Sequence, residues 1–553
     1  MRRRDLFTVP FLAAAQSSDS LDPRNIKHGS VIPDEGYADQ PYVVITKQGH
    51  WLCTITTGAG VEGQGGQHVV ALLSNDQGRT WSSPIDIEPA SGPEASWALP
   101  LITPSGRVYV FYTYNRDNIR LVPQVPSPAI SRRVDTLGVY AYRFSDDGGR
   151  TWSKQRFEIP LPEWPFDHDN NFGGQQRFFW GVGKPLVDRG SVFIGFARIS
   201  RWGLPGVLMR SRGFLLRSDN ILTEPDPTRI RWQQLPTDLE GFRAPKGPIA
   251  EETNAVALSD GSLYVLYRTI DGYLCESYSR DRGRTWTPPA YARRANGQPI
   301  KNPRAFAFAR RFSNGKFLLW FHNHGGEPVH LLPRWDVYLD RNPGWILGGI
   351  EDRGRILWSE PEILLYDDAP ATRISYPDFI EDRGRYFITE TQKSIARVHE
   401  LDRHLLASLW NETPPPPPRP PACSFHFRHR FGDLYPGQTL IDTPALKLAI
   451  SDRFSLRLTL GDFSCESDSG THPGTLRTGV TQHIAVIVDA APRIISFVID
   501  GIFNDGGSTR QFGWTRYPAE LTLSPSPIES KLSGFQYLPY PLRTTEAVRL
   551  SRR

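Results

Sequence analysis

Two stretches of the sequence bring together residue types that could do chemistry. In the first, Glu252 and Arg268 each lie eight residues from Asp260, within a turn signal at 259–262 (SDGS) between two β-rich runs. Such a turn predicts a hairpin. Equal distances from its centre predict that the two residues face each other across the antiparallel pair. A carboxylate beside a guanidinium at the open end of a hairpin can bind or activate a polar group.

The second stretch places a phenol opposite a carboxylate. A turn near Asp382 and Arg383 puts Tyr376 across from Glu390, and Asp378 lies two residues further along the first strand. A phenol is a poor nucleophile at neutral pH and needs a neighbouring base. A strand end that offers a phenol and carboxylates is therefore a candidate for nucleophilic catalysis.

Short repeats identify the elements that must position these residues. The pattern Ser-x-Asp-x-Gly-x-Thr-Trp occurs at 74–81, 145–152 and 279–286, and a less complete copy runs from Asp352 to Trp358. We expect the Asp to accept backbone hydrogen bonds across a turn, the Gly to adopt a positive φ and the Trp to pack on the sheet. The repeat is therefore structural, and three near-identical copies indicate a repeated β architecture.

A second repeat supplies the strands. An apolar strand, a turn and a second apolar strand recur six times at a mean spacing of about 67 residues, beginning at Pro41, Pro100, Pro185, Ala255, Pro303 and Pro377. Six small antiparallel sheets fanned about one axis leave few strand edges exposed. The sequence therefore predicts an all-β fold with a six-bladed β-propeller over residues 30–411.

Polar groups from distant parts of the chain gather at one end of this predicted ring. Asp39 lies at the open end of the first inner hairpin and Arg304 at that of the fifth, where His324 lies opposite it across the turn at 314–315. The hairpins of Glu252 and Tyr376 open toward the same end. Convergence of charged and phenolic groups on one axial mouth is typical of a binding or catalytic site.

These features resemble the sialidase (neuraminidase) superfamily, whose propellers carry the same Asp-box hairpins. Sialidases have a Glu, a hairpin with Ser-Asp-Gly at its turn and then an Arg, as at Glu252 and Arg268. They also have a Tyr at the start of the last inner hairpin and a Glu at its end, as at Tyr376 and Glu390. The resemblance covers about two thirds of the chain. It implies a retaining exo-glycosidase in which Tyr376 attacks the anomeric carbon and Glu252 takes its proton.

The resemblance also implies a carboxylate clamp, from which this chain departs. Arg268 and Arg304 would grip a sugar carboxylate, but the Arg expected before Pro41 is replaced by Asp39 and Gln40. The loop at 58–68, where the family has an acidic Asp, holds Glu62 and His68 instead. These departures point away from strict sialidase activity, toward another acidic or a neutral sugar. The predicted catalytic residues are Tyr376, Glu252, Glu62 and Asp39, and the predicted substrate-binding residues are Arg268, Arg304, Gln40, His68, Asp378, Glu390 and His324.

Two other functions fit the same pattern. A polysaccharide lyase acting on uronic acids could use a Tyr with His68 to abstract and donate protons. A glycan-binding propeller without catalysis is the second alternative, because the first Arg and the acidic Asp are absent. Each residue also has an ordinary structural explanation: Tyr376 as a half-buried strand aromatic, and Glu252 with Arg268 as a cross-strand ion pair.

The chain continues beyond the predicted propeller into a second region. A Pro-rich run at 412–421 predicts a stiff linker. Within residues 422–553, the strands at 483–489 and 494–500 resemble the late hairpin of laminin-G and concanavalin-like domains, which implies a β-sandwich (jelly roll) that often accompanies glycosidases. Cys423 and Cys465 could form a disulfide there.

Composition and the N-terminus set the broad class. Residues 1–20 read as a signal peptide, with a basic start whose Arg3-Arg4-x-Leu6 resembles a twin-arginine signal. We therefore expect an exported protein with no membrane span. The net charge of +5, from 64 basic and 59 acidic residues, is too small and too scattered to indicate a nucleic-acid partner, and we expect none. The sequence predicts a monomer that takes a glycan substrate and needs no cofactor or metal, since no such motif occurs.

Overall fold

A computed structural model describes residues 22–123, 130–200, 210–326, 341–412, 422–504, 515–523 and 527–553. The predicted signal peptide at 1–20 and the linker residues 413–421 lie outside the described residues. No helix among the described residues is long and apolar enough to cross a membrane.

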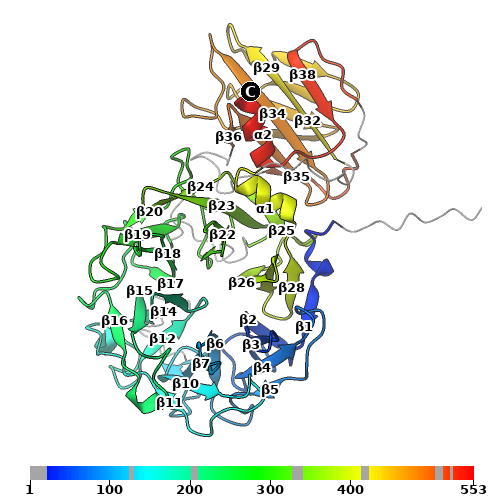
Figure 1. Cartoon of the computed structure of the whole chain (residues 1–553). Helices are drawn as coiled ribbons and strands as arrows, with labels where there is room; N and C mark the ends of the chain where they lie inside the picture. The colour runs from blue at the N-terminus through cyan, green and yellow to red at the C-terminus, as the bar shows by residue number, and fades with distance from the viewer. Residues whose placement is uncertain are drawn as a thin grey trace, which may run out of the picture.

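Six antiparallel sheets surround one axis in the described part of the chain, and we call them blades 1 to 6 (Figure 1). Blade 1 holds β2 (Tyr37–Ile45), β3 (Trp51–Gly58), β4 (His68–Ser74) and β5 (Ile85–Asp86), and blade 2 holds β6 (Ala95–Ile102), β7 (Val108–Tyr114), β10 (Val139–Ser145) and β11 (Phe157–Glu158). Blade 3 holds β12 (Phe178–Gly181), β13 (Leu186–Asp188), β14 (Ser191–Ile199), β15 (Ser211–Ser218) and β16 (Gln233–Leu235). Blade 4 holds β17 (Ala250–Ala257), β18 (Leu263–Thr269), β19 (Cys275–Ser279) and β20 (Ala290–Tyr291).

The last two blades complete the ring. Blade 5 holds β21 (Phe308–Arg311), β22 (Phe317–Phe321), β23 (Gly344–Asp352), β24 (Arg355–Trp358) and β25 (Glu362–Leu365). Blade 6 holds β26 (Ser375–Asp382), β27 (Arg385–Thr391), β28 (Ala396–Glu400) and β1 (Ser30–Ile32). Small elements decorate the blades: β8 (Val122–Pro123), β9 (Ile130–Ser131) and the 3₁₀ turns η1 (Ile26–His28), η2 (Asp167–Asp169) and η3 (Pro227–Arg229). The all-β fold and its repeated inner hairpins are as predicted.

The Asp-box hairpins have the predicted hydrogen bonds. In the first copy, Asp76 Oδ1 accepts the backbone N–H groups of Arg79 (3.1 Å) and Thr80 (2.9 Å), and Oδ2 accepts the Thr80 hydroxyl (2.7 Å). Gly78 has a φ of +82°. Burial raises the pKa of Asp76, but hydrogen bonds from the Thr80 hydroxyl, the Thr80 backbone and the Ser74 hydroxyl together outweigh it and lower the pKa to about 2. These hairpins follow the third strand of a blade and fix the turn that leads to its outer strand, away from the axis.

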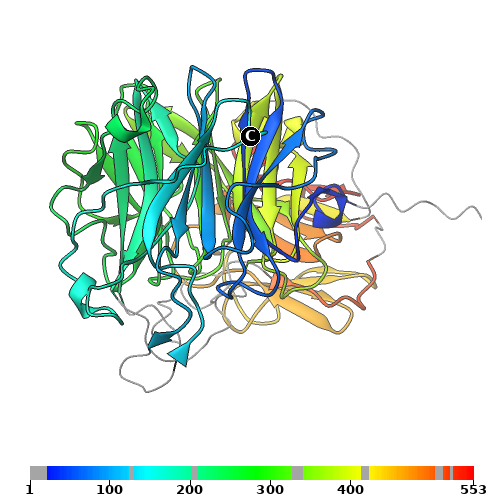
Figure 2. The same ribbon diagram turned by 90° about the horizontal axis from the view of Figure 1, so that it is seen from below.

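A β-bulge recurs at the axial start of the inner strand in four blades. The register shifts between Asp39 and Tyr42 in β2, Ser96 and Leu99 in β6, Glu251 and Asn254 in β17, and Ser375 and Asp378 in β26. Each shift contains a non-glycine residue with positive φ: Gln40 (53°), Trp97 (70°), Glu252 (55°) and Tyr376 (46°). A bulge re-aims side chains, so these four residues occupy equivalent places around the mouth. Figure 2 shows the blades side by side, with their strands running along the ring axis.

The C-terminal region forms two further sheets. One contains β29 (Cys423–Arg430), β34 (Thr481–Asp489), β35 (Ile494–Ile499), β36 (Ile502–Phe503), β37 (Thr515–Arg516) and β38 (Ser533–Leu538), and the other β30 (Thr439–Asp442), β31 (Lys447–Ile450), β32 (Leu456–Leu460) and β33 (Phe463–Glu466). Side chains of both sheets share one hydrophobic cluster. Cys423 and Cys465 are both free thiols, so the suggested disulfide is absent. The likeness to laminin-G domains stays a prediction.

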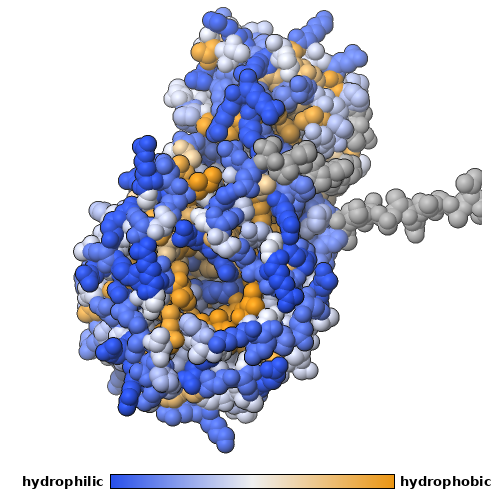
Figure 3. Space-filling view, in the orientation of Figure 1, coloured by the Kyte–Doolittle hydropathy of each residue, from blue (hydrophilic) through white to orange (hydrophobic). Residues whose placement is uncertain are grey.

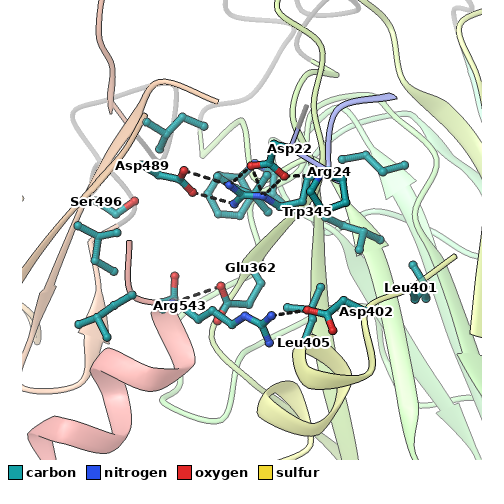
Figure 4. A pocket seen from close by; sticks show the side chains of 18 of the residues that line it. Asp22, Arg24, Trp345, Glu362, Leu401, Asp402, Leu405, Asp489, Ser496 and Arg543 are labelled. Atoms are coloured by element: carbon teal, nitrogen blue, oxygen red, sulfur yellow. Dashed lines mark hydrogen bonds and ion pairs between the residues drawn. The ribbon is translucent and has the colours of Figure 1, made fainter. Parts of the chain in front are cut away.

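This region packs against the propeller at blade 5 (Figure 1). Apolar side chains of β34, β35 and helix α2 (Thr544–Ser551) join the cluster of blades 4 and 5, and α2 contacts helix α1 (Arg403–Leu409). A cavity of about 190 Å³ remains between the two parts. Figure 4 shows its polar ends closed by ion pairs, with Arg24 between Asp22 and Asp489 and Arg543 on Asp402. Its polar groups are thus matched within the chain.

Candidate functional site

The structure brings the predicted phenol and carboxylate together from different blades. Tyr376, on β26 of blade 6, donates a hydrogen bond from its hydroxyl to Glu252 Oε1, on β17 of blade 4, at 3.0 Å. Their chain positions differ by 124 residues, and both side chains are buried. The shared bulge explains the meeting, because it places both side chains at equivalent points around the axis. Figure 3 shows one face of the ring hollowed about this axis, with a polar rim.

A second carboxylate, Glu251, was not predicted and organises the arginines. Its Oε1 accepts Arg268 Nε at 2.9 Å and Arg304 Nε at 2.7 Å, while Oε2 accepts the Ser211 hydroxyl at 2.7 Å. Glu251 is fully buried. Two predicted substrate-binding arginines, from blades 4 and 5, are thus fixed by one carboxylate.

The predicted pairing of Glu252 with Arg268 is wrong in register. Glu251, not Glu252, is the Cα partner of Arg268. Between this pair and the pair Asn254–Leu266, the bulge gives β17 one residue more than β18. The side chains still meet, since Arg268 Nη1 lies 2.8 Å from Glu252 Oε2. Arg268 therefore bridges both carboxylates.

Arg341 is a further cation beside Tyr376 that sequence reasoning missed. Its Nη1 donates to the Ser375 hydroxyl (3.0 Å) and its Nη2 to the Arg304 carbonyl (3.1 Å). Its guanidinium carbon lies 6.0 Å from the Tyr376 ring centroid, and the residue is 3% exposed. Both hydrogen-bond partners are neutral, and Arg341 forms no ion pair with a carboxylate in the described part of the chain. It precedes blade 5's third strand, where neither repeat places a functional residue.

Lys393 is the other missed cation. It lies in the turn between β27 and β28, and its Nζ is 2.6 Å from Asp39 Oδ2 and 3.5 Å from Glu62 Oε1. The same Nζ lies 4.2 Å from the Tyr376 ring centroid. Asp39 and Glu62, both predicted as catalytic, thus reach the site through this lysine. Arg133 holds Glu62 from the other side, at 3.2 Å.

The remaining predicted residues divide into two groups. Gln40 is fully buried at the bulge of blade 1, and neither of its amide atoms has a hydrogen-bond partner among the described residues. His324 is buried after β22. Asp378 lies along the axis, where it binds Lys184 Nζ (2.7 Å) and accepts the backbone N–H of Val43 (2.9 Å).

His68 and Glu390 make their contacts elsewhere. His68 lies on β4, where its Nε2 contacts Glu35 (2.8 Å) and its Nδ1 the Glu88 carbonyl (2.9 Å). The suggested partnership of His68 with a catalytic tyrosine is therefore not assembled. Glu390 contacts Gln392 and the ring of His399 within its own blade. The bulge in β26 sets Tyr376 and Pro377 between the pairs Ser375–Thr391 and Asp378–Thr389, so Glu390 has no direct partner on β26. Its register partner is Arg397 on β28.

Burial and charge separate the acids of the site. Burial raises the pKa of Glu252, and the nearby Glu251 adds to this, against the effect of Arg268. Burial opposes ionisation of Glu251 too, but Arg304 and Arg268 outweigh it and lower its pKa to about 2. Burial and the charge of Glu252 raise the pKa of Tyr376. At neutral pH the phenol is thus protonated beside a carboxylate that is more basic than usual, which is the combination a base-assisted nucleophile needs.

Asp39 and Glu62, the carboxylates beside Lys393, have pKa values shifted in opposite directions. Burial raises the pKa of Asp39 although Lys393 opposes the shift. Glu62 is also desolvated, but Lys393 and Arg133 hold its pKa far below the ordinary range. An acid held ionised in this way stabilises positive charge and is a poor proton donor.

Comparisons with known proteins give one short family match and several distant structural similarities. The BNR/Asp-box repeat family matches residues 143–154. A Hadza microbial sialidase is 17% identical, with a TM-score of 0.44 and 66% of each chain covered. The chain thus spans just under two thirds of the length of that sialidase. NanB sialidase from Streptococcus pneumoniae is 14% identical, with a TM-score of 0.46 over 69% of this chain and 71% of that one. A protein of unknown function from Dyadobacter fermentans is 16% identical, with a TM-score of 0.45 over 68% of this chain and 98% of that one.

No curated protein sequence matches the chain. The chemistry proposed below therefore rests on the geometry around Tyr376. The chain is similar to sialidases in fold at low sequence identity, and its family match is confined to one Asp-box repeat.

Proposed function

We propose that the protein is an exo-acting glycoside hydrolase for a terminal acidic sugar, with Tyr376 as nucleophile and Glu252 as its base. The observation that carries this proposal is the buried hydrogen bond of 3.0 Å between the two side chains, which come from blades 4 and 6. A structural strand aromatic needs no basic carboxylate of raised pKa at its hydroxyl.

The reaction follows from this pair. Tyr376 Oη attacks the anomeric carbon while its proton passes to Glu252 Oε1, and the bond to the leaving oxygen breaks. Water then displaces the tyrosyl oxygen, and Glu252 returns its proton to the phenol. The proton that the attacking water loses passes through solvent to the oxygen that has left. A neutral nucleophile suits an anionic substrate, because a second carboxylate would repel it. Retention of configuration is the expected outcome of two displacements.

The acidic substrate is inferred from the cations that surround the phenol. Arg341 is buried, and its hydrogen-bond partners among the described residues are neutral. Burying an uncompensated guanidinium is costly unless an anion joins it. Arg268 lies on the other side of Glu252. A planar guanidinium can hold a carboxylate through two parallel hydrogen bonds. A sugar carboxylate beside the anomeric centre would compensate these charges.

Aryl glycosides of acidic sugars test the proposal most directly, because a phenolate leaves without help from an acid. We expect release of the aryl group by the wild type, and a 10²- to 10⁴-fold lower kcat for Glu252→Gln, the range for loss of a general base. Tyr376→Phe should lose turnover and keep the affinity for the free sugar. A fluorinated substrate analogue should label the peptide that contains Tyr376.

Other outcomes separate the alternatives. A product that absorbs in the ultraviolet would identify a lyase instead. Binding without turnover in the wild type would identify a glycan-binding propeller. Wild-type turnover by Tyr376→Phe would refute the nucleophile assignment.

Two further assignments belong to this proposal. Export is supported by the basic and apolar composition of residues 1–20. A packing role for the C-terminal region is supported by the apolar side chains of β34, β35 and α2 that join the cluster of blades 4 and 5.

A further inference from the structure

We propose that Lys393 binds the anionic group of the substrate and determines specificity for it, with Asp39 as its positioning residue. This inference rests on the proposed function and extends it to the blade 1 side of the site. There, the predicted clamp lacks an arginine and carries a carboxylate instead.

The main chain holds Lys393 in place at the seam of blades 1 and 6. The residue has a φ of +72°, a conformation that is unfavourable for a non-glycine residue. Its carbonyl accepts the Ala38 N–H (3.2 Å) and its N–H donates to the Thr391 hydroxyl (2.9 Å). This conformation places the ammonium 4.2 Å from the Tyr376 ring centroid and 5.4 Å from that of Trp97. The side chain is 10% exposed, so it reaches the mouth.

Asp39 holds this cation as Glu251 holds the arginines. Both carboxylates immediately precede the positive-φ residue of a bulge, Gln40 in one case and Glu252 in the other. Glu251 binds Arg268 and Arg304, and Asp39 binds Lys393. Equivalent backbone positions therefore present cations on two sides of Tyr376, each fixed by a buried carboxylate.

The ammonium retains donors for a ligand. An ammonium has three N–H groups, and Asp39 accepts the one hydrogen bond that Lys393 Nζ donates among the described residues. Asp39 also accepts the Tyr37 hydroxyl (2.9 Å) and the Gln40 N–H (3.0 Å). Glu62 lies closer to Arg133 (3.2 Å) than to Lys393 (3.5 Å). The negative charge around Lys393 is thus shared with other partners.

Gln40 adds a second group for recognition on the same side. Its buried amide has no hydrogen-bond partner among the described residues, and leaving such a group unsatisfied is costly. The bulge places Gln40 at the point equivalent to Glu252 and Tyr376. A sugar that offers an anion to Lys393 and a hydroxyl to Gln40 would satisfy both.

The test compares an aryl sialoside with its carboxamide, which lacks the charge. For Lys393→Met we expect KM for the sialoside to rise about 10- to 100-fold, the loss of one charge-assisted hydrogen bond. KM for the carboxamide should change less than about 2-fold. Lys393→Arg, which keeps the charge, should stay within about 5-fold of the wild type on the sialoside. Lys27→Met, at a surface ion pair with Asp368, is the matched control and should change neither KM.

Other outcomes overturn the inference. Wild-type KM for the sialoside in Lys393→Met, or an equal rise for both substrates, would show that Lys393 only packs the site. If Lys393→Met fails to fold, Lys393→Gln replaces it with the same expectation. For Asp39→Asn we expect a raised KM with kcat preserved. A fall of kcat alone would make Asp39 catalytic. If the wild type hydrolyses no aryl glycoside of an acidic sugar, the proposed function fails, and calorimetry with free sialic acid still tests Lys393 through the affinity lost in Lys393→Met.

Discussion

Replacing Glu251 by Gln tests how the site is held together. The substitution keeps the shape and an acceptor for Ser211 but removes the charge that faces Arg268 and Arg304, whose side chains are 7% and 2% exposed. Breaking a buried ion pair by removing one partner costs about 3–5 kcal/mol, because the remaining charge is left uncompensated. Glu252 still faces Arg268, so we expect the lower end of this range.

The pKa of Glu251 gives a second estimate of the same quantity. Its value falls from 4.5 to about 2 on folding, and at 1.36 kcal/mol per unit this shift contributes about 3 kcal/mol. The folded pKa is depressed, so this stability is complete above pH 4.5 and is lost as the pH falls through 2. The amide has no such titration. The difference in unfolding free energy between wild type and Glu251→Gln should thus be about 3 kcal/mol at pH 7 and fall to roughly half of that at pH 3.

Urea denaturation followed by tryptophan fluorescence at several pH values measures this difference. Glu158→Gln is the control in the same propeller, because Glu158 pairs with Arg116 at the surface, where both side chains are about half exposed. It should cost less than about 1 kcal/mol at every pH. A loss below 1 kcal/mol for Glu251→Gln at pH 7, or one that does not change between pH 7 and 3, would refute the role given to Glu251.

Three further predictions address the base, the hairpins and the thiols. Because the pKa of Glu252 is raised and the base must be ionised, the acid limb of kcat/KM should inflect above pH 4.5, and an inflection at or below that value would contradict the assignment. Asp76→Ala should lower the unfolding free energy by about 1–3 kcal/mol with kcat/KM unchanged, since it removes hydrogen bonds far from the axis. Thiol titration of the denatured, unreduced protein should count four free cysteines, and a count of two would restore the disulfide.

The sheets could be predicted because their signals are local. An Asp-box needs only eight neighbouring residues to define its hydrogen bonds. Each inner hairpin is predicted by an apolar run on either side of a turn. Tyr376 and Glu252 could be paired because each begins an inner strand, and a ring brings equivalent positions together. Such inference requires the symmetry of the fold and no knowledge of side-chain contacts.

The details of the site escaped prediction for a physical reason. Glu252 and Tyr376 adopt positive φ without being glycine, so nothing in the sequence marks the bulges that shift the register. Glu251 was hidden beside Glu252, where strand alternation alone would turn it away. Arg341 and Lys393 come from segments between the repeats, and only the folded chain shows that they reach Tyr376.

The pairing of β1 with β28 makes the last sheet a joint product of both ends of the propeller sequence. Across the same junction, Asp378 accepts the Val43 N–H, and the Thr389 hydroxyl donates to the Pro41 carbonyl. Tyr376 and Lys393 lie on the blade 6 side of this junction, and Asp39 and Gln40 lie on the blade 1 side. A nascent chain therefore has no complete site until residue 400 has been made and has returned to meet residue 30. The proposed activity therefore depends on closure of the ring. If the chain were cut between residues 30 and 400, the site could form only when the two fragments associate.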